Sequence, residues 1–286
     1  MPREIRIVDV FTDKALAGNQ LAVVLDGEGL SRDHMQQIAR EMNFSETTFI
    51  LRPDDPASVA RVRIFTPSQE LKFAGHPTIG TAWVLFDEGI AAGDRLVLEE
   101  GVGPVAVRRN DAMLWMTHPL VEFGEVFPHA RVTEALGLDE SAALPDVPAQ
   151  VVTTGTPFLF IALTDKRAVD GALPDPQRLK RLLEGHDAHG VFLFAAAGAG
   201  RMVAVDIAED PATGSASGPL GAFAVRYGLI ERAPTVSIIS EQGTKMGRQS
   251  FVHIELEYSD SSDLPARIEV GGSVVPVLSG ALSDFS

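Results

Sequence analysis

Polar and apolar residues alternate in many short runs along the chain, and only a few longer stretches carry apolar residues at helical spacing. Alternation with a period of two is typical of half-buried strands, whereas apolar residues at every third or fourth position are typical of helices. In the first part of the chain this pattern predicts helices over residues 31–43 and 77–88. It predicts strands over residues 5–10, 20–25, 47–51, 59–65, 95–99, 104–109 and 113–117.

The alternation stops near His118, and residues 123–148 hold several prolines and glycines with one short helix-like piece over 133–138. We therefore expect one domain over residues 1–118 and a second over 119–272. The predicted helices of the second half cover residues 176–184 and 215–227. Its predicted strands cover residues 150–153, 158–163, 191–194, 202–205, 236–240, 251–256, 266–270 and 274–278. Helices do not alternate with every strand, so the pattern predicts an α+β fold.

Two short segments, residues 72–77 and 209–216, share one architecture and lie in different halves. In each, a turn of small residues ends in glycine and runs into an apolar stretch, which stops at another glycine 14 residues on: Gly75 to Gly89, and Gly214 to Gly228. The repeat predicts two equivalent halves whose helix N-termini converge on one cleft. Backbone N–H groups at those ends would favour an anion such as a substrate carboxylate.

The amino-acid composition argues against several classes of function. The net charge of −15 argues against nucleic acid as a partner, because binding to phosphates needs a basic face. The absence of cysteine excludes disulfides and thiolate nucleophiles. The longest tight apolar run, residues 158–163, is far too short to span a membrane, so we expect a cytoplasmic protein without a membrane partner.

Three ionisable residues are candidates for chemistry. Glu46 stands at the mouth of a predicted strand among apolar neighbours; it is either an exposed strand-end carboxylate or a general acid/base whose pKa partial burial raises. Asp210 stands at the entry to the second repeated helix, where it is either an N-cap or a site residue. His76 stands at the corresponding entry in the first half, as a polar turn residue or a proton carrier.

Other small and polar positions support two interpretations each. Gly75, Gly214 and Ser215 are either anion contacts or helix-capping positions. His186 and His189 have a spacing that suits metal ligands, but no third ligand follows at a recognisable distance. A solvated loop is therefore the favoured interpretation there, and we expect no metal.

Four motifs resemble those of the phenazine-biosynthesis PhzF-like isomerase family. They are residues 39–49, residues 63–67 with 70–77, residues 209–216, and Gln242-Gly243 with Met246-Gly247-Arg248. They follow the family's order over nearly the whole chain. Residues 201–208 depart from the family pattern, which has an aromatic–Ser/Ala–Pro stretch and a longer loop there.

The resemblance implies a diaminopimelate epimerase-like fold: two pseudo-symmetric domains, each a mixed sheet wrapped around a central helix. It also implies that a final strand within residues 273–286 completes the first half, that the site lies between the halves, and that the protein is a homodimer. Related epimerases and racemases use a cysteine pair, which this chain lacks.

The resemblance implies an isomerase without cofactor or metal, similar to trans-2,3-dihydro-3-hydroxyanthranilate isomerase of phenazine biosynthesis. It would move a proton on a small cyclic amino or hydroxy acid, a small-molecule carboxylate. Glu46 would be the general acid/base, and His76 and Asp210 would orient the substrate and stabilise the shifted charge. The pocket would be lined by Ser45, Gly75, Thr213, Gly214 and Ser215.

The candidate residues are also compatible with two other functions. The chain could be an epimerase or isomerase of another amino-acid-like substrate, with Glu46 and Asp210 as a two-base pair on opposite faces. It could also be a non-catalytic protein that binds a small acid through the same cleft.

Overall fold

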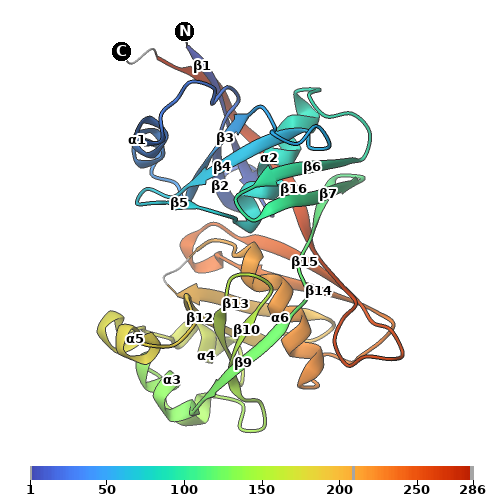
Figure 1. Ribbon diagram of the computed structural model, residues 1–286. Coiled ribbons are helices and arrows are strands. Elements are labelled where there is room, and N and C mark those ends of the chain that lie inside the picture. The colour runs from blue at the N-terminus through green and yellow to red at the C-terminus, as the bar shows by residue number, and fades with distance from the viewer. Residues whose placement is uncertain (1, 208–209, 284–286) are drawn as a thin grey trace. The chain divides into compact units, whose positions relative to one another are not determined.

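The computed structural model describes residues 2–207 and 210–283 of the chain (Figure 1). The chain forms two compact units. The first holds Met1–Thr117, Lys245–Ser250 and Gly271–Ser286, and the second holds His118–Thr244 and Phe251–Val270. Among the described residues, no helix combines the length and the apolar character that crossing a membrane requires.

The first unit is a mixed sheet around one helix, α2. Its strands follow the order β1-β2-β3-β4-β6-β7-β8, with β5 paired to β4. Their bounds are β1 (Arg3–Val10), β2 (Asn19–Val24), β3 (Glu46–Leu51), β4 (Ala60–Phe65), β5 (Glu70–Leu71), β6 (Arg95–Glu100), β7 (Gly103–Asn110) and β8 (Met113–Thr117). Helix α2 packs against β1, β2, β3, β6 and β8, so the sheet wraps around it.

Helix α1 (Arg32–Met42) covers the sheet near β3 and β4 and lies within the predicted range 31–43. The Ser31 side chain accepts a hydrogen bond from the His34 backbone N–H at its start. Asn43 ends it in the left-handed conformation that asparagine tolerates.

Helix α2 (Gly75–Asp87) differs from its prediction at the start and in its burial. It begins two residues before Pro77, which is therefore the third helical residue and not the first. Proline fits there because the N–H groups of the first turn have no intrahelical acceptor. Nearly every side chain of α2 is buried, not one stripe alone, since strands surround it. It ends before Gly89, which has a positive φ of 68°.

The second unit repeats this plan around helix α6 (Gly214–Arg226). Its strand order is β15-β14-β13-β12-β11-β10-β9. The strand bounds are β9 (Glu122–Phe127), β10 (Ala149–Thr153), β11 (Phe158–Ala162), β12 (Gly190–Ala196), β13 (Arg201–Ile207), β14 (Thr235–Gln242) and β15 (Ser250–Glu257). The remaining helices are α3 (His129–Ala135), α4 (Lys166–Gly171) and α5 (Pro176–Leu183), with short 3-10 turns at Glu140–Ala142 and Thr244–Met246. A cluster of phenylalanines from β11, β12 and α6 forms its core.

Strand pairing shows the pseudo-symmetry directly. In each unit a strand pairs in parallel with the next one along, β2 with β3 and β11 with β12. The second strand of each pair then has an antiparallel neighbour: β3 pairs with β4, and β12 pairs with β13. After the central helix, the next strand pairs in parallel with that neighbour: β6 with β4, and β14 with β13. Glu46 and Gly190 are the first residues of the equivalent strands β3 and β12.

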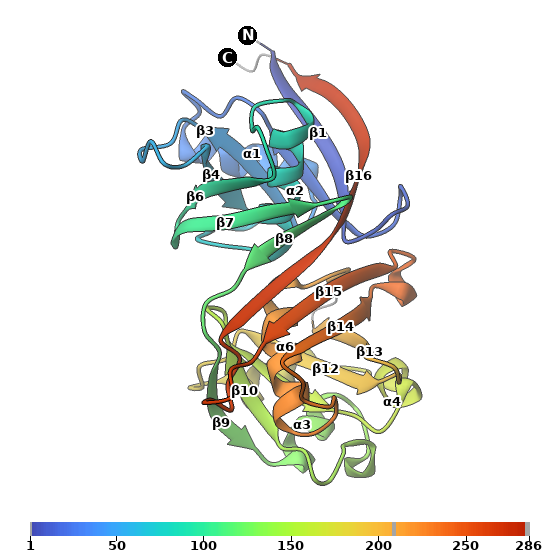
Figure 2. The ribbon, with the colours of Figure 1, turned by 90° about the vertical axis from the view of Figure 1, so that its right-hand side faces the viewer.

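The last strand, β16 (Arg267–Leu282), is one strand where the sequence pattern predicts two. From Val274 to Leu282 it pairs antiparallel with β1 (Figure 2). The division into two strands is wrong because the glycines at 271 and 272 do not interrupt the strand. A Cβ atom on Gly271 would lie 2.4 Å from the Leu114 carbonyl oxygen and 2.6 Å from the Trp115 ring, so glycine is needed for close packing inside a continuous strand.

Three elements of the second unit were not predicted correctly. Strand β9 is largely exposed and lacks apolar alternation, so the pattern does not reveal it. Helix α3 starts at residue 129 and not at 133, and helix α4 was missed because it spans only six residues. Short or exposed elements leave little hydrophobic periodicity to detect.

Candidate functional site

Glu46 is the first residue of β3 and lies opposite Leu21 of β2. Its side chain is 15% exposed, so most of the carboxyl group is removed from solvent. Ser45 immediately precedes it and is half-buried. The structure therefore places Glu46 at a strand mouth in a partly buried setting, and the alternative of a fully exposed strand-end carboxylate is wrong.

His76 is the second residue of α2 and only 3% exposed. Its Nε2 lies 3.3 Å from Glu46 Oε2, although 30 positions separate the two residues. On the other side of the ring, Asn19 Nδ2 donates to His76 Nδ1 over 3.1 Å. Because Nδ1 then accepts, the proton of the neutral imidazole sits on Nε2 and faces Glu46.

Burial keeps this imidazole neutral. It lowers the pKa of His76 to about 3, and a hydrogen bond with the Gln20 backbone only partly opposes it. His76 is therefore a neutral group whose Nε2 faces Glu46 at physiological pH, and not a cation.

Asn19 is a site residue that sequence reasoning missed, and the 245–250 segment holds it. Gly18 N donates to the Gln249 carbonyl oxygen over 3.0 Å, and Arg248 Nε donates to the Gly18 carbonyl oxygen over 2.9 Å. Arg248 also forms an ion pair with buried Asp9. Part of the signal was present, since Arg248 belongs to a quoted motif and Asn19 directly precedes the predicted strand over residues 20–25.

In the second unit, Asp210 lies beside a second carboxyl group. Thr213 Oγ1 is 3.0 Å from Asp210 Oδ2 and 3.0 Å from Asp206 Oδ2. Burial raises the pKa of Asp206 to about 7, and the negative charge of Asp210 adds to the effect. One hydroxyl hydrogen cannot serve both acceptors, so a proton on Asp206 completes the group. Sequence reasoning missed Asp206.

Asp210 is not the N-cap of α6, so that alternative is wrong. Thr213 occupies the cap position, and its backbone N–H donates to Gln242 Oε1 over 3.0 Å. Gly214 and Ser215 are the first two residues of the helix. Ala208 and Glu209, which belong to the segments singled out from sequence, lie outside the described residues.

The N-cap residues of α2 and α6, Ala74 and Thr213, make no side-chain hydrogen bond to the first turn of their helices. Gly75 and Gly214 begin the two helices, so each start presents backbone N–H groups in the way the repeat predicts. That both starts bind one substrate stays a prediction.

The histidine pair of the second unit has an ordinary structural environment. His186 Nδ1 lies 2.7 Å from Glu125 Oε2, and the ring packs edge-on against Phe127. Across residues 2–207 and 210–283, no three or more His, Cys, Asp or Glu side chains are grouped to hold a metal ion.

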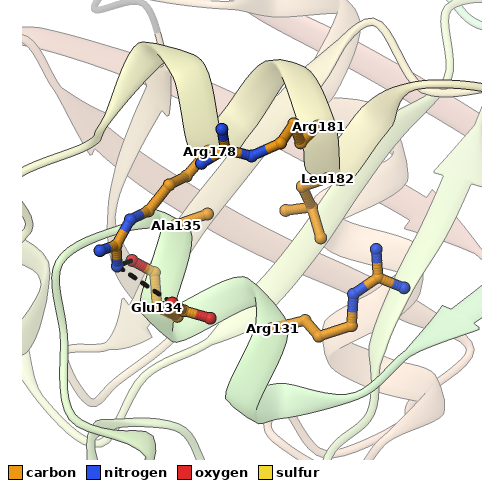
Figure 3. Close-up of a pocket in the computed structure, with 6 residues that line it drawn as sticks. All are labelled: Arg131, Glu134, Ala135, Arg178, Arg181 and Leu182. Carbon is orange, nitrogen blue, oxygen red and sulfur yellow. Dashed lines mark hydrogen bonds and ion pairs between the residues drawn. The ribbon is translucent and has the colours of Figure 1, made fainter.

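A hollow of about 200 Å³ lies between α3 and α5 (Figure 3). Arg178 on its rim donates to the Glu134 carbonyl oxygen and pairs with its carboxylate. No predicted site residue lines it. Its lining residues are Arg131, Glu134, Ala135, Arg178, Arg181 and Leu182.

Comparison with known proteins agrees with the fold. A family model described as phenazine biosynthesis-like protein matches residues 8–280. The trans-2,3-dihydro-3-hydroxyanthranilate isomerase of Pseudomonas chlororaphis is 35% identical over 281 residues, which cover 94% of this chain and 95% of that protein. A solved Pseudomonas aeruginosa structure, described as a predicted epimerase, matches 99% of this chain and 100% of its own at 30% identity and a TM-score of 0.83.

A Bacillus anthracis structure of the PhzF family reaches a TM-score of 0.87 at 23% identity, covering 99% of this chain and 100% of its own. At that identity the likeness concerns the fold alone. It confirms the α+β class with two pseudo-symmetric domains.

Proposed function

The chain belongs to the phenazine biosynthesis-like protein family and is an isomerase, and on this premise we propose that Glu46 is its general acid/base. The observation that carries the proposal is the contact between Glu46 and the neutral His76, both largely removed from solvent. A catalytic carboxylate must be oriented and partly desolvated to move a proton efficiently. This pair meets both conditions.

The proposed reaction moves one proton within one molecule. The Glu46 carboxylate removes a proton from a carbon of the substrate, the double bonds shift, and the resulting carboxylic acid returns the proton to another carbon on the same face. No electrons leave the substrate, so the reaction needs no oxidant or reductant. A cysteine pair cannot take this role, because the sequence has no cysteine.

His76 has a supporting role in this proposal. Its Nε2 lies 3.3 Å from Glu46 Oε2, and in this proposal the contact tightens to a hydrogen bond when substrate is bound, which orients the carboxylate and weakens when Glu46 takes up the proton. Since the imidazole stays neutral, it does not bind Glu46 as a permanent ion pair, and the carboxylate keeps its basicity.

We propose a small cyclic amino or hydroxy acid as the substrate. The uncapped N-terminus of α2 lies at His76, so it offers backbone donors to a carboxylate near the proposed base. The Pseudomonas chlororaphis relative is named for trans-2,3-dihydro-3-hydroxyanthranilate, which belongs to this class. Asp210 and the residues at the start of α6 are proposed to contact the substrate as well, with Thr213, Gly214 and Ser215 next to Asp210 in the chain.

The direct test is Glu46→Gln, which keeps the size of the side chain and removes its basicity. We expect turnover of trans-2,3-dihydro-3-hydroxyanthranilate to fall by about 10²- to 10⁴-fold, the usual contribution of general acid–base catalysis. The melting temperature should stay close to that of the wild type. The matched control is Glu41→Gln, an exposed glutamate at the end of α1, which should retain full turnover.

Turnover of Glu46→Gln within a few-fold of wild type would remove the proposed role. Product formed in D₂O separates the one-base shift from a two-base epimerisation, since internal return leaves less deuterium in the product. Wild-type protein that binds the acid without converting it would favour the binding-protein alternative.

We further propose a homodimer located in the cytoplasm. Family resemblance supports the first statement, and the lack of a long apolar segment in the sequence supports the second. Sedimentation equilibrium measures the oligomeric state.

A further inference from the structure

Thr78, in the first turn of α2, is buried with its hydroxyl between two oxygen atoms. Its Oγ1 lies 2.8 Å from the Ala74 carbonyl oxygen and 2.7 Å from Glu100 Oε1 at the end of β6. A hydroxyl carries a single hydrogen, and a carbonyl oxygen can only accept. If both contacts are hydrogen bonds, the second hydrogen belongs to the carboxyl group of Glu100.

The other oxygen of Glu100 also favours an uncharged group. Glu100 is 6% exposed, and its Oε2 is buried without a hydrogen-bond partner among the described residues. A buried ionised oxygen without donors costs far more free energy than a buried carbonyl oxygen.

The second unit contains a neutral version of the same arrangement. Ser217 is the fourth residue of α6, as Thr78 is the fourth of α2, and its hydroxyl donates to the Thr213 carbonyl oxygen over 2.9 Å. The side chain that reaches it is Gln242, at the end of β14, whose Nε2 lies 3.5 Å from Ser217 Oγ. β14 is the equivalent of β6, so an amide donor stands where the first unit has Glu100.

We propose that Glu100 is a positioning residue that stays uncharged in the folded protein. Its carboxyl group donates a hydrogen bond to the Thr78 hydroxyl oxygen. The start of α2 therefore remains free of negative charge and can receive a substrate carboxylate. An ionised Glu100 would place a competing anion against the same helix turn. This inference rests on the proposed function for the substrate carboxylate, whereas the protonation state itself rests on the contacts of Thr78.

The electrostatic surroundings of Glu100 favour its uncharged form. Burial raises the pKa of Glu100 to about 8, and the Thr78 hydrogen bond lowers it only in part. Glu99, the neighbour on β6, accepts from the Asp54 and Asp55 backbone N–H groups. Arg61, on the paired strand β4, is bonded to the Asp54 side chain.

Among the described residues, no charged group contributes to the shifted pKa of Glu100, whose causes are burial and the Thr78 hydrogen bond. On the segment before α2, Lys72 packs its backbone against Gly101. His76 on α2 is neutral. The β7 residues opposite the end of β6 are Gly103 and Pro104, which do not ionise.

The first test reads the proton directly. The infrared spectrum of the wild-type protein at pH 7 should contain, besides any band of Asp206, a buried carboxylic acid band that disappears as the pH rises past about 8 and is absent from Glu100→Gln. Glu99→Gln, the matched control on the same strand, should retain the band. A wild-type spectrum at pH 7 without a band that Glu100→Gln removes would overturn the inference, whatever the enzyme does.

The second test asks whether Glu100 acts through α2. Glu100→Ala should lower kcat/KM about tenfold, because a small displacement of a catalytic group reduces the rate strongly. Glu100→Gln should recover most of that loss, since Gln242 shows that an amide suits this position. If Glu100→Gln is as impaired as Glu100→Ala, the positioning role is wrong.

The third test follows binding of anthranilate, a stable cyclic amino acid with a carboxylate. Its affinity for wild-type protein should weaken as the pH rises past about 8, whereas its affinity for Glu100→Gln should stay level. A parallel decline in both proteins would contradict the inference. Loss of activity in Glu46→Gln with level anthranilate binding in both proteins would leave the proposed function standing and remove this inference alone.

Discussion

At the scale of single residues, protonation states follow from burial more than from pairing. His76 and Glu100 both belong to the interior of the first unit, and burial holds each in its neutral form, lowering one pKa and raising the other. Neither residue needs a counter-ion, so the start of α2 carries no charged side chain from this pair. The helix N-terminus is then left with its own partial positive charge.

His76 makes the free energy of unfolding depend on pH in the acidic range. Its folded pKa of about 3 lies below the ordinary histidine value of 6.5, so the unfolded chain binds the proton more readily between these values. Stability should therefore fall as the pH drops below 6.5, by up to ~1.4 kcal/mol per pH unit. Chemical denaturation of His76→Gln should show a shallower fall over the same range.

The exposed His34 on α1 offers a control for this measurement, because His34→Gln should leave the acid dependence as it is. Equal slopes for wild type and His76→Gln would mean that His76 titrates normally in the folded protein.

At the scale of elements, the two central helices were recognised from sequence because their signals are local. Each starts at a glycine and ends before another with a positive φ, 68° at Gly89 and 70° at Gly228. The starts were shifted by one or two residues, since the first helical turn makes no intrahelical N–H bonds that a pattern could register. The long strand β16 was divided wrongly because Gly271, which lies inside it, serves a packing contact with β8.

The segment 245–250 shows an element acting on the site from a distant part of the sequence. Arg248 pairs with Asp9 and donates to the Gly18 carbonyl oxygen, next to Asn19. We expect Arg248→Met to lower the free energy of unfolding by about 3–5 kcal/mol, because it leaves the Asp9 carboxylate buried without its partner. Urea denaturation measures the change.

Two further variants keep this prediction specific. Lys166→Met breaks an exposed pair with Asp170 and should cost no more than about 0.5 kcal/mol. Asp9→Asn in the Arg248→Met background should recover part of the loss, since it removes the buried charge. If the double variant recovers nothing, the loss in Arg248→Met does not come from Asp9.

At the scale of the whole molecule, the net charge of −15 opposes an anionic substrate before any contact is made. Salt screens that repulsion, with a Debye length of about 8 Å at physiological ionic strength. The affinity for anthranilate should therefore rise roughly two- to threefold between about 10 mM and 150 mM salt. Calorimetric titration measures it, and the uncharged anthranilamide should show no such rise.

Much of the architecture follows from the chain without coordinates. The repeated glycine-bounded helices, the strand-rich pattern and the position of Glu46 at a strand mouth are local features, and local features survive in a single sequence. What the pattern did not contain was the identity of the groups that surround those residues. The residues next to Asn19, Asp206 and Glu100 in the sequence do not mark them as unusual. Each forms its hydrogen bond with a residue that is not its neighbour in the chain.

The sequence by itself determined the α+β class, the twofold repeat and the likeness to a family of isomerases, because these depend on periodicity and on motifs of consecutive residues. Only the tertiary structure decided that His76 meets Glu46, that Arg248 supports Asn19 and that Thr78 meets Glu100. Hydrogen bonds and burial join residues that are far apart along the chain, and the protonation states follow from that burial. They become visible when the sheet has wrapped around its helix.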